Sequence, residues 1–437
     1  MMHKKLWAVL SVLLIAAMLF NLGGCAAAKP TTPTDPTTPT NPNPPAASGS
    51  VDLMAGFTPT SAPDASGMTP EALAAATDFA LRLFRAGNTP GENTLISPLS
   101  VLCALAMTAN GANGETLTQM EHTLGLPRDR YNAFFHSCLA ALAEGDGGVL
   151  SLANAIWFTS DERFTVNRDF LQTNADYYGA GAYRAPFDET TLRDINNWVG
   201  QKTDGMIPEI LDQIPPEAVM YLVNALAFDA KWQTPYPEYA VGQGSFTAAS
   251  GETRTVEYLY SEEHCYLEDE NATGFLKRYA GGRYAFAALL PKEGVSVEAY
   301  LETLDGAHLQ ALVTEPQDVP VLTSLPKFET AWSGELSDLL VSMGMTDAFD
   351  STLADFSGLG TSTGGNIFIN RVIHKTFISV TEGGTRAGAA TVVEMTDGVA
   401  MMDELKQVYL DRPFVYLLID CESGLPIFIG TMNDPGQ

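Results

Sequence analysis

Few residues of this chain stand in patterns that catalyse reactions. The sequence contains no HExxH, no GxSxG, no Walker loop and no GxGxxG leading into a helix. The nearest approach to a nucleophilic serine turn, at residues 242–245, reads Gly-Gln-Gly-Ser and has the wrong spacing. His374 lies inside an expected strand, where a hydrogen-bonded structural role is commoner than that of a general base. Carboxylates are numerous enough to leave an acid–base pair open, but no motif predicts an enzyme.

A different pattern occurs in residues 382–391, which read Glu-Gly-Gly-Thr-Arg-Ala-Gly-Ala-Ala-Thr. The glycines disfavour a helix, and a core strand would carry more β-branched and aromatic residues. In a strand, where alternate side chains share a face, one face of this region would hold only uncharged residues: Thr385, Ala387, Ala389, Thr391 and Val393. The charged Arg386 and Glu394 would lie opposite. The segment therefore suits either a strand that joins a sheet later or a flexible surface loop.

The elements that would position this segment are helices in the first third of the globular part and strands in the rest. Thr69-Pro70 and Ser97-Pro98 are typical helix starts, because a hydroxyl at the N-cap precedes a proline in the first turn. Strands are expected in the apolar runs at residues 148–158, 220–228, 284–290, 367–381, 414–419 and 427–430. This order predicts the α+β class.

Composition restricts the possible partners. The 437 residues are 46% hydrophobic, enough for one large domain or two ordinary ones. With 52 acidic and 24 basic residues the net charge is −28, which opposes binding to nucleic acid. The cysteines are Cys25, Cys103, Cys138, Cys265 and Cys421. They form no CxxC pair and no ligand-like spacing with histidine, so we expect no metal and no cofactor.

The N-terminus is typical of an exported protein. Lys4 and Lys5 precede an apolar run at residues 6–20, which ends at Leu-Gly-Gly-Cys25. This ending resembles a bacterial lipobox, in which Cys25 would become the lipidated first residue. An ordinary signal peptide, or a short membrane span with a chance cysteine, is the alternative.

A spacer follows this signal. Residues 29–50 are rich in Pro, Thr, Asn and Ser, a composition that favours an extended chain over a packed core, although a proline-rich ligand for a partner is conceivable. We therefore expect a signal peptide at 1–24, a lipidated, disordered tether at 25–64 and one globular domain at 65–437. The protein would be anchored by lipid on the outer face of a bacterial cell membrane.

An ordered series of motifs over residues 68–434 resembles the serpin family. The motifs, in family order, are Asn93-Thr94-Leu95-Ile96-Ser97-Pro98-Leu99-Ser100, Gly111-Ala112-Asn113-Gly114-Glu115-Thr116, Asn154-Ala155, Tyr178-Gly179-Ala180, Ile195-Asn196-Asn197-Trp198-Val199, Leu222-Val223-Asn224-Ala225, His374-Lys375 and Asp411-Arg412-Pro413-Phe414-Val415. Each fragment alone is weak, whereas the ordered series is specific.

The resemblance implies three β-sheets, eight or nine helices and an exposed reactive loop. It implies a monomeric inhibitor of serine proteases, with cysteine proteases as a further possibility, and not an enzyme. A target protease would cleave the loop and form an acyl-enzyme, after which residues 382–391 would insert as a new strand. A non-inhibitory serpin that binds or carries a ligand is the alternative, and an unrelated lipoprotein enzyme or solute-binding protein is a third.

The same resemblance assigns roles to particular residues. The hinge would comprise Glu382, Gly383, Gly384, Thr385, Ala387, Ala389, Ala390 and Thr391. The shutter under the large sheet would comprise Ser97, Ser100, Asn224 and His374, and Trp232 would mark the breach where insertion begins. The loop is longer than is usual, so counting from Glu382 or back from Pro413 places the scissile region at Gly398, Val399, Ala400, Met401 and Met402. These apolar residues favour elastase-, subtilisin- or chymotrypsin-like targets over trypsin-like ones.

Overall fold

The computed structural model describes residues 49–60, 67–143, 150–214, 220–385 and 405–436. Residues 48–437 form one compact unit. Cys25, the hinge residues beyond Thr385 and the scissile region at 398–402 lie outside the described residues. The predicted boundaries of the signal peptide and tether therefore stay predictions.

Three main sheets and nine α-helices make up the described residues, so the predicted α+β class with three sheets and eight or nine helices is confirmed. The helices are α1 (Pro70–Gly87), α2 (Pro98–Ala109), α3 (Gly114–Leu124), α4 (Arg128–Ala143), α5 (Arg168–Tyr177), α6 (Glu189–Lys202), α7 (Val297–Thr303), α8 (Gly306–Thr314) and α9 (Ser337–Ser342). Two short 3₁₀ helices are η1 (Glu238–Ala240) and η2 (Asp347–Phe349).

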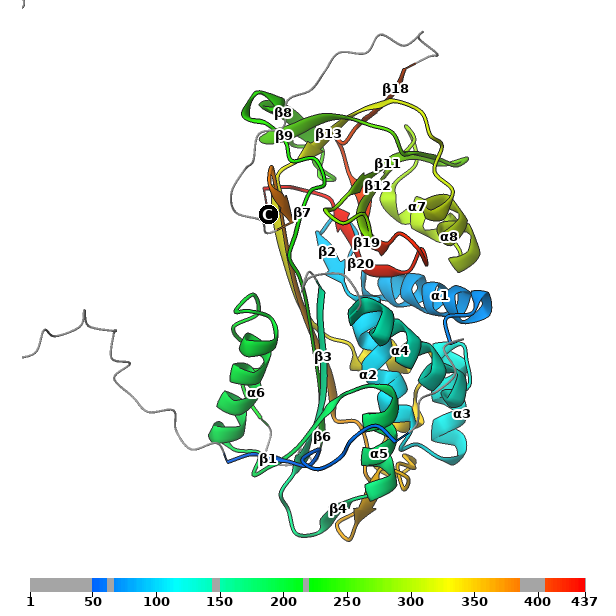
Figure 1. Ribbon diagram of the computed structural model, residues 1–437, viewed down its shortest axis with the longest axis vertical. Coiled ribbons are helices and arrows are strands. Elements are labelled where there is room, and N and C mark those ends of the chain that lie inside the picture. The colour runs from blue at the N-terminus through cyan, green and yellow to red at the C-terminus, as the bar shows by residue number, and fades with distance from the viewer. Residues whose placement is uncertain (1–48, 61–66, 144–149, 215–219, 386–404, 437) are drawn as a thin grey trace, which may run out of the picture. The chain divides into compact units, whose positions relative to one another are not determined.

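The largest sheet has eight strands. Its order is β1 (Val51–Asp52), β5 (Gly181–Ala185), β3 (Leu150–Thr159), β6 (Met220–Phe228), β16 (Arg371–Thr381), β17 (Gly384–Thr385) and β7 (Ala230–Lys231), with β14 (Phe328–Glu335) also paired to β16. Figure 1 shows α6 on one face of this sheet and α2, α4 and α5 on the other. Helices therefore lie on both faces, but β16 alternates between buried and half-buried residues, which is typical of a strand with one more open face.

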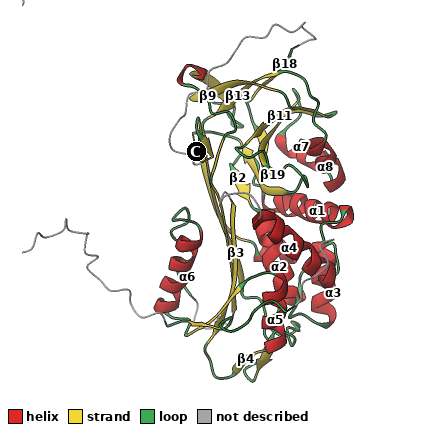
Figure 2. Cartoon of the chain, viewed as in Figure 1, coloured by secondary structure: helices red, strands yellow, loops and turns green. Residues whose placement is uncertain are grey.

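The other strands form a six-stranded, a four-stranded and a two-stranded sheet. The six-stranded sheet runs β10 (Tyr266–Glu268), β11 (Ala272–Arg278), β12 (Tyr284–Pro291), β19 (Phe414–Asp420), β20 (Pro426–Met432) and β2 (Thr94–Ile96). The four-stranded sheet runs β18 (Lys406–Tyr409), β13 (Val321–Pro326), β9 (Thr253–Glu263) and β8 (Val241–Thr247). The small pair is β15 (Gly360–Ser362) with β4 (Phe164–Val166). Figure 2 shows α1, α7 and α8 gathered beside the six-stranded sheet.

The predicted helix starts are correct at both prolines. Thr69 is the N-cap of α1, and its hydroxyl accepts a hydrogen bond from the amide of Ala72 at 3.2 Å. Ser97 precedes α2 but makes no such cap, because its hydroxyl donates to the carbonyl of Ile427 instead. Every residue of α2 is buried, so this helix lies in the core beneath the eight-stranded sheet.

Residues 49–60, which the sequence assigns to the tether, contact the domain. Val51 and Asp52 pair with Arg184 and Tyr183, so β1 lengthens the eight-stranded sheet by one edge strand. The amide of Thr60 donates to Asp176 on α5 at 2.7 Å. A protein fragment for experiments should therefore begin no later than residue 49.

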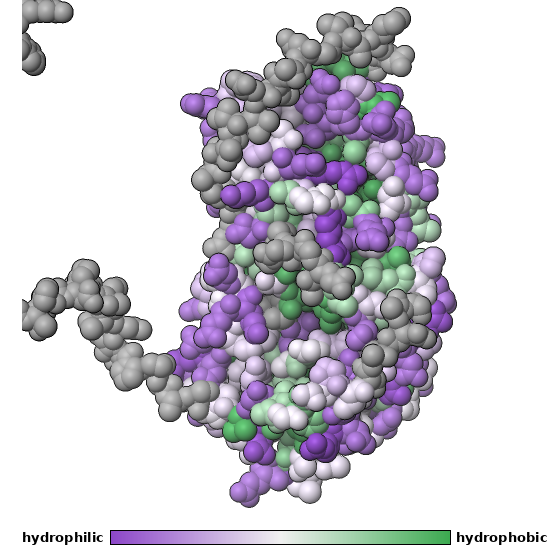
Figure 3. All heavy atoms as spheres, in the orientation of Figure 1, coloured by the Kyte–Doolittle hydropathy of each residue, from purple (hydrophilic) through white to green (hydrophobic). Residues whose placement is uncertain are grey.

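Polar side chains predominate on the face shown in Figure 3, and hydrophobic ones form small groups. Five large hydrophobic residues are notably exposed among those described: Val51, Tyr239, Tyr260, Leu353 and Tyr409. None of the described helices combines the length and hydrophobicity that crossing a membrane requires.

Candidate functional site

The eight-stranded sheet contains a seam between β6 and β16. These strands are parallel neighbours, yet only residues 371–373 of β16 pair with residues 221–223 of β6. Pairing on this edge of β16 resumes only at Val380 and Thr381, which pair with β17. Residues 374–379 therefore have no strand partner on this side among the described strands. We call the gap between residues 374–379 and β6 the seam.

The beginning of the predicted hinge lies at one end of the seam, next to Val380 and Thr381 of β16, and we call this end the head of the seam. Thr385 pairs with Val380 on one side and Ala230 on the other, so β17 is a two-residue strand wedged between β16 and β7. Gly384 has a φ of +152°, and a Cβ there would lie 2.1 Å from the carbonyl oxygen of Ala230. Only glycine fits this close approach. Gly384 and Thr385 thus form strand pairs on both sides, with β16 and with β7.

Glu382 and Gly383 are fixed through their backbone. The amides of Trp232 and Tyr236 donate to the carbonyls of Gly383 and Glu382, both at 3.0 Å. The Glu382 carboxylate lies 3.1 Å from the ammonium of Lys327. A hydrogen bond from its own backbone amide, followed by the contact with Lys327, lowers the pKa of Glu382. Glu382 is therefore charged at neutral pH, and its ion pair with Lys327 connects the hinge to the start of β14.

Trp232, the residue predicted for the breach, contacts the hinge directly. Its indole Nε1 donates to the carbonyl of Thr381 at 2.8 Å. Its ring stacks on Tyr279 with centroids 4.5 Å apart, and the Tyr279 hydroxyl lies 2.6 Å from that of Thr385. Sequence reasoning missed Tyr279, whose only signal is an aromatic residue at the end of the apolar run of β11.

The four predicted shutter residues lie buried beneath the seam and form two pairs. The Ser97 amide donates to Nε2 of His374 at 3.0 Å, and the Asn224 side chain donates to the carbonyl of Ser100 at 2.8 Å. Asn224 also donates to the side chain of Asn154 on β3. The structure thus joins β16 to α2 through one pair and β6 to α2 through the other.

Three polar atoms of this group make no hydrogen bond within the described residues. They are Ser100 Oγ, Asn224 Oδ1 and His374 Nδ1. Because Nε2 of His374 accepts a hydrogen bond, the ring proton must lie on Nδ1. Burial lowers the pKa of His374 to about 3, so the ring is neutral at physiological pH. A buried polar group left without any partner, protein or water, would cost about 1–3 kcal/mol.

Sequence reasoning assigned no role to two further polar residues beneath the seam. The Thr376 hydroxyl donates to the carbonyl of Leu95 at 2.7 Å, and Asn154 donates to Sγ of Cys103 at 3.0 Å. The signal for Thr376 is its spacing of two residues from His374, which places both side chains on the same face of β16.

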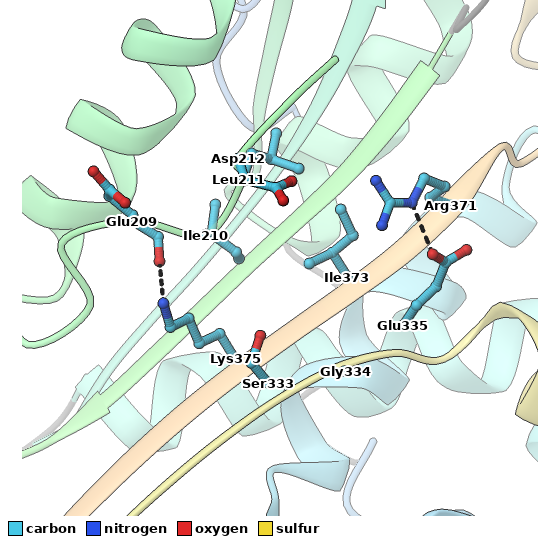
Figure 4. A pocket seen from close by; sticks show the side chains of 10 residues that line it. All are labelled: Glu209, Ile210, Leu211, Asp212, Ser333, Gly334, Glu335, Arg371, Ile373 and Lys375. Atoms are coloured by element: carbon cyan, nitrogen blue, oxygen red, sulfur yellow. Dashed lines mark hydrogen bonds and ion pairs between the residues drawn. The ribbon is translucent and has the colours of Figure 1, made fainter. Parts of the chain in front are cut away.

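At the other end of the seam, β16 pairs with β6 at residues 371–373, and residues 209–212 lie against this closed end. Figure 4 shows Arg371, Ile373 and Lys375 directed from β16 toward a cavity of about 280 Å³ that residues 209–212 border. The Lys375 ammonium donates to the carbonyl of Glu209, and Arg371 pairs with Glu335, each at 2.8 Å. Both cations already have partners, so among the described lining residues no unpaired cation is left for an anionic ligand.

The comparison with protein families settles the kind of protein. The family model described as Serpin (serine protease inhibitor) matches residues 74–435. The chain belongs to the serpin family. It is 30% identical to the leukocyte elastase inhibitor of Homo sapiens over 378 residues, which cover 82% of this chain and 98% of the relative. An uncharacterized serpin-like protein of Thermococcus kodakarensis is 32% identical over 358 residues, covering 80% and 82% of the two chains.

Solved structures distinguish two forms of a related serpin. The thermophilic serpin tengpin in its native state matches with a TM-score of 0.83 and 44% identity, covering 88% of this chain and 99% of tengpin. Tengpin in its latent state matches with a TM-score of 0.74 and 45% identity, covering 84% and 98%. The identities are almost equal, so the difference in TM-score reflects conformation. This serpin is described in an arrangement nearer to the native form.

The described part of this serpin holds no cluster of three or more His, Cys, Asp and Glu residues that could bind a metal ion. The chemistry that its site supports is conformational. Among the described residues, the site combines a strand edge without a partner at residues 374–379, three buried polar atoms without a hydrogen bond, and a two-residue strand at Gly384 and Thr385.

Proposed function

We propose that this serpin inhibits proteases by suicide trapping, with residues 386 onward as the strand that fills the seam. The observation that carries the proposal is β17, which holds Gly384 and Thr385 between β16 and β7. A protease would cleave within residues 398–402 and remain attached as an acyl-enzyme. The freed segment would extend β17 down the seam and move the protease with it before the acyl bond is hydrolysed.

The register of β17 predicts where the inserted residues would lie. Thr385 pairs with Val380 in antiparallel register, so each later residue would pair one position earlier on β16. Ala387, Ala389 and Thr391 would then lie opposite Ile378, Thr376 and His374. These three residues of β16 are buried, so the small, uncharged face of the hinge would enter the core. Arg386 would lie on the other face, where a charge is tolerated.

The free energy favours insertion on two counts. The unpaired edge of β16 at residues 374–379 would gain ladder hydrogen bonds, each worth about 0.5–1.5 kcal/mol net. In addition, the Thr391 hydroxyl would arrive opposite His374, whose Nδ1 proton lacks a partner. The form described here would then be a kinetic trap whose stored free energy drives protease capture.

Apolar residues at 398–402 favour elastase-, subtilisin- or chymotrypsin-like targets, and the likeness to leukocyte elastase inhibitors supports the first of these. Cysteine proteases are a second class of target to be tried. We propose that the protein acts as a monomer and needs no cofactor.

The decisive experiment incubates the protein from residue 49 onward with pancreatic elastase, subtilisin, chymotrypsin and trypsin. A band resistant to denaturant at the summed mass would establish trapping, and the mass of the released C-terminal peptide would locate the scissile bond. Cleavage without a complex, and without a rise in the melting temperature, would refute inhibition and indicate a carrier or substrate serpin.

We further propose that Cys25 is lipidated and that the protein is anchored on the outer face of a bacterial membrane. The support is the sequence Leu-Gly-Gly-Cys25 behind a basic and apolar leader. Expression with labelled palmitate in bacteria should label the wild type and leave Cys25→Ala unlabelled. Equal partitioning of both proteins into the aqueous phase of a detergent extract would contradict the anchor.

A further inference from the structure

The breach contains a buried ion pair that the proposed trapping reaction does not use. Lys277, the penultimate residue of β11, is 3% exposed, and its ammonium lies 2.7 Å from Oε1 of Glu263 at the end of β9. Glu263 is 16% exposed. The pair joins the six-stranded sheet to the four-stranded sheet. Its lysine is the least exposed cation in any ion pair of the described residues.

The ammonium lies over the two aromatic rings that adjoin the hinge. Its Nζ is 4.1 Å from the centroid of the Tyr236 ring and 5.7 Å from that of the Trp232 ring. The backbone amides of the same two residues donate to the carbonyls of Glu382 and Gly383. Only one layer of side chains therefore separates the charge of Lys277 from the hinge.

The carboxylate is held in place from the opposite side. Ser261, two residues before Glu263 on β9, donates its hydroxyl to Oε1 of Glu263 at 2.6 Å. The hydroxyl of Thr323 on β13 lies 2.9 Å from that of Ser261. Two neighbouring strands thus orient Glu263, and Glu263 fixes the lysine.

A contribution to the stability of the fold is a weak explanation for burying the Lys277–Glu263 ion pair. Removing two charges from water is expensive, and apolar residues of similar volume often stabilise a protein as much or more. A cation placed over an aromatic face, by contrast, defines where the ring lies, and the attraction is about 2 kcal/mol when both groups are desolvated. The position of the pair under the breach points to control of the rings.

We propose that Lys277 is a positioning residue for the hinge. With Glu263 as its counter-ion, it holds Trp232 and Tyr236 so that their amides keep Glu382 and Gly383 at the head of the seam. Gly384 and Thr385 then stay inserted before cleavage, and the new strand grows from an existing nucleus. The inference rests on the proposed trapping mechanism, to which it adds the residues that set how fast insertion starts.

The test replaces both charges, Lys277→Met with Glu263→Gln, so that no buried charge is left unpaired. Lys277→Arg keeps the cation and serves as the rescue. The control is Arg254→Met with Asp434→Asn. That pair also anchors β9, at a distance of 2.9 Å, but Arg254 lies nine residues before Glu263, at the other end of the strand and about 30 Å away.

The first measurement is hydrogen exchange of the Trp232 and Tyr236 amides, with the amides of α2 as an internal reference. We expect exchange about tenfold faster in the neutral double variant, since a loss of about 1.4 kcal/mol is a factor of ten. The arginine variant should restore protection, and the control pair should leave both amides unchanged. Equal acceleration in α2 would mean global destabilisation and would overturn the positioning role.

The second measurement is the fraction of protein that ends as complex and not as cleaved product, with a protease that the wild type traps. We expect this fraction to fall at least severalfold in the neutral variant and not in the control. Unchanged exchange together with an unchanged complex fraction would refute the positioning role and leave trapping intact. Absence of any complex with the wild type would refute trapping, while the exchange of the two amides would still decide whether Lys277 positions the hinge.

Discussion

The hinge residue Thr385 offers the sharpest test of strand insertion. Its side chain is 1% exposed and its hydroxyl lies 2.6 Å from that of Tyr279, in a space lined by strands on both sides. Thr385→Arg would force a long cation into this site, where the structure shows no carboxylate partner among the residues that contact Thr385. An unpaired charge buried in this way costs several kcal/mol.

The penalty should act both before and after cleavage. Before cleavage, the arginine would move out of the sheet. The pairs of β17 with β16 and β7 would then be lost, and the amides of Trp232 and Tyr236 would lose their carbonyl partners. After cleavage, a penalty of about 3 kcal/mol on insertion would slow that step by about 150-fold. Because insertion competes with hydrolysis of the acyl-enzyme, almost all of the variant should be released as cleaved product.

The assay compares Thr385→Arg with Thr385→Ser, which keeps the hydroxyl and the small size. Both variants should be cleaved at the same bond and at similar rates, but only the serine variant should form the denaturant-resistant complex. The cleaved serine variant should melt at a higher temperature than its intact form, and the cleaved arginine variant should not. A complex formed by Thr385→Arg in wild-type yield would show that β17 is not the start of the inserting strand.

Three further predictions concern the ends of the seam and the shutter. His374, with a pKa of about 3 when folded and about 6.5 when unfolded, should contribute stability that is complete above pH 6.5 and is lost as pH falls toward 3. The difference in free energy of unfolding between wild type and His374→Gln, measured by urea denaturation, should therefore change by on the order of 5 kcal/mol over that range, and a constant difference would contradict a buried neutral ring. Lys327→Met, which removes the partner of Glu382, should speed conversion to an inactive form severalfold at low salt and have no effect in 1 M NaCl, measured as residual inhibition with time. Lys375→Met should raise amide exchange at residues 209–212, because it removes the 2.8 Å hydrogen bond to Glu209, and should leave exchange in α2 unchanged.

Apolar runs predicted the strands well where burial and pairing coincide. The run at residues 220–228 is β6, and the run at 284–290 lacks only the last residue of β12. The run at 367–381 begins four residues too early, since β16 starts at Arg371. Ile367 and Ile369 are buried, but the Ile369 amide bonds to Ala348 outside any sheet. Hydrophobicity indicates burial, and it does not tell which backbone partner a residue finds.

The site was predictable in part. The two-residue period of the hinge predicts an uncharged face, which beyond Thr385 lies outside the described residues and stays a prediction. That Gly384 and Thr385 form a strand between β16 and β7 depends on Ala230 and Tyr279, which lie more than a hundred residues away. Lys277 left only a weak signal, because it is followed by Arg278 at the end of β11, and its partner Glu263 could not be identified without the packing of β9 against β11.

The seam and the shutter both contain backbone or side-chain groups whose hydrogen bonds are unmet among the described residues. Nδ1–H of His374, Oδ1 of Asn224 and Oγ of Ser100 are buried and find no partner among the described residues, and all three belong to side chains beneath the strand edge that no described strand pairs. A sheet that only had to be stable would close β6 onto β16 along the whole seam and would meet these groups with polar side chains. Continuing β17 in its present register would supply both a ladder for residues 374–379 and a hydroxyl opposite His374. On the proposed mechanism, the added strand would pair residues 374–379 and give His374 a partner, so both would contribute to the driving force for insertion, and removing the unmet groups should stabilise the uncleaved form at the expense of trapping.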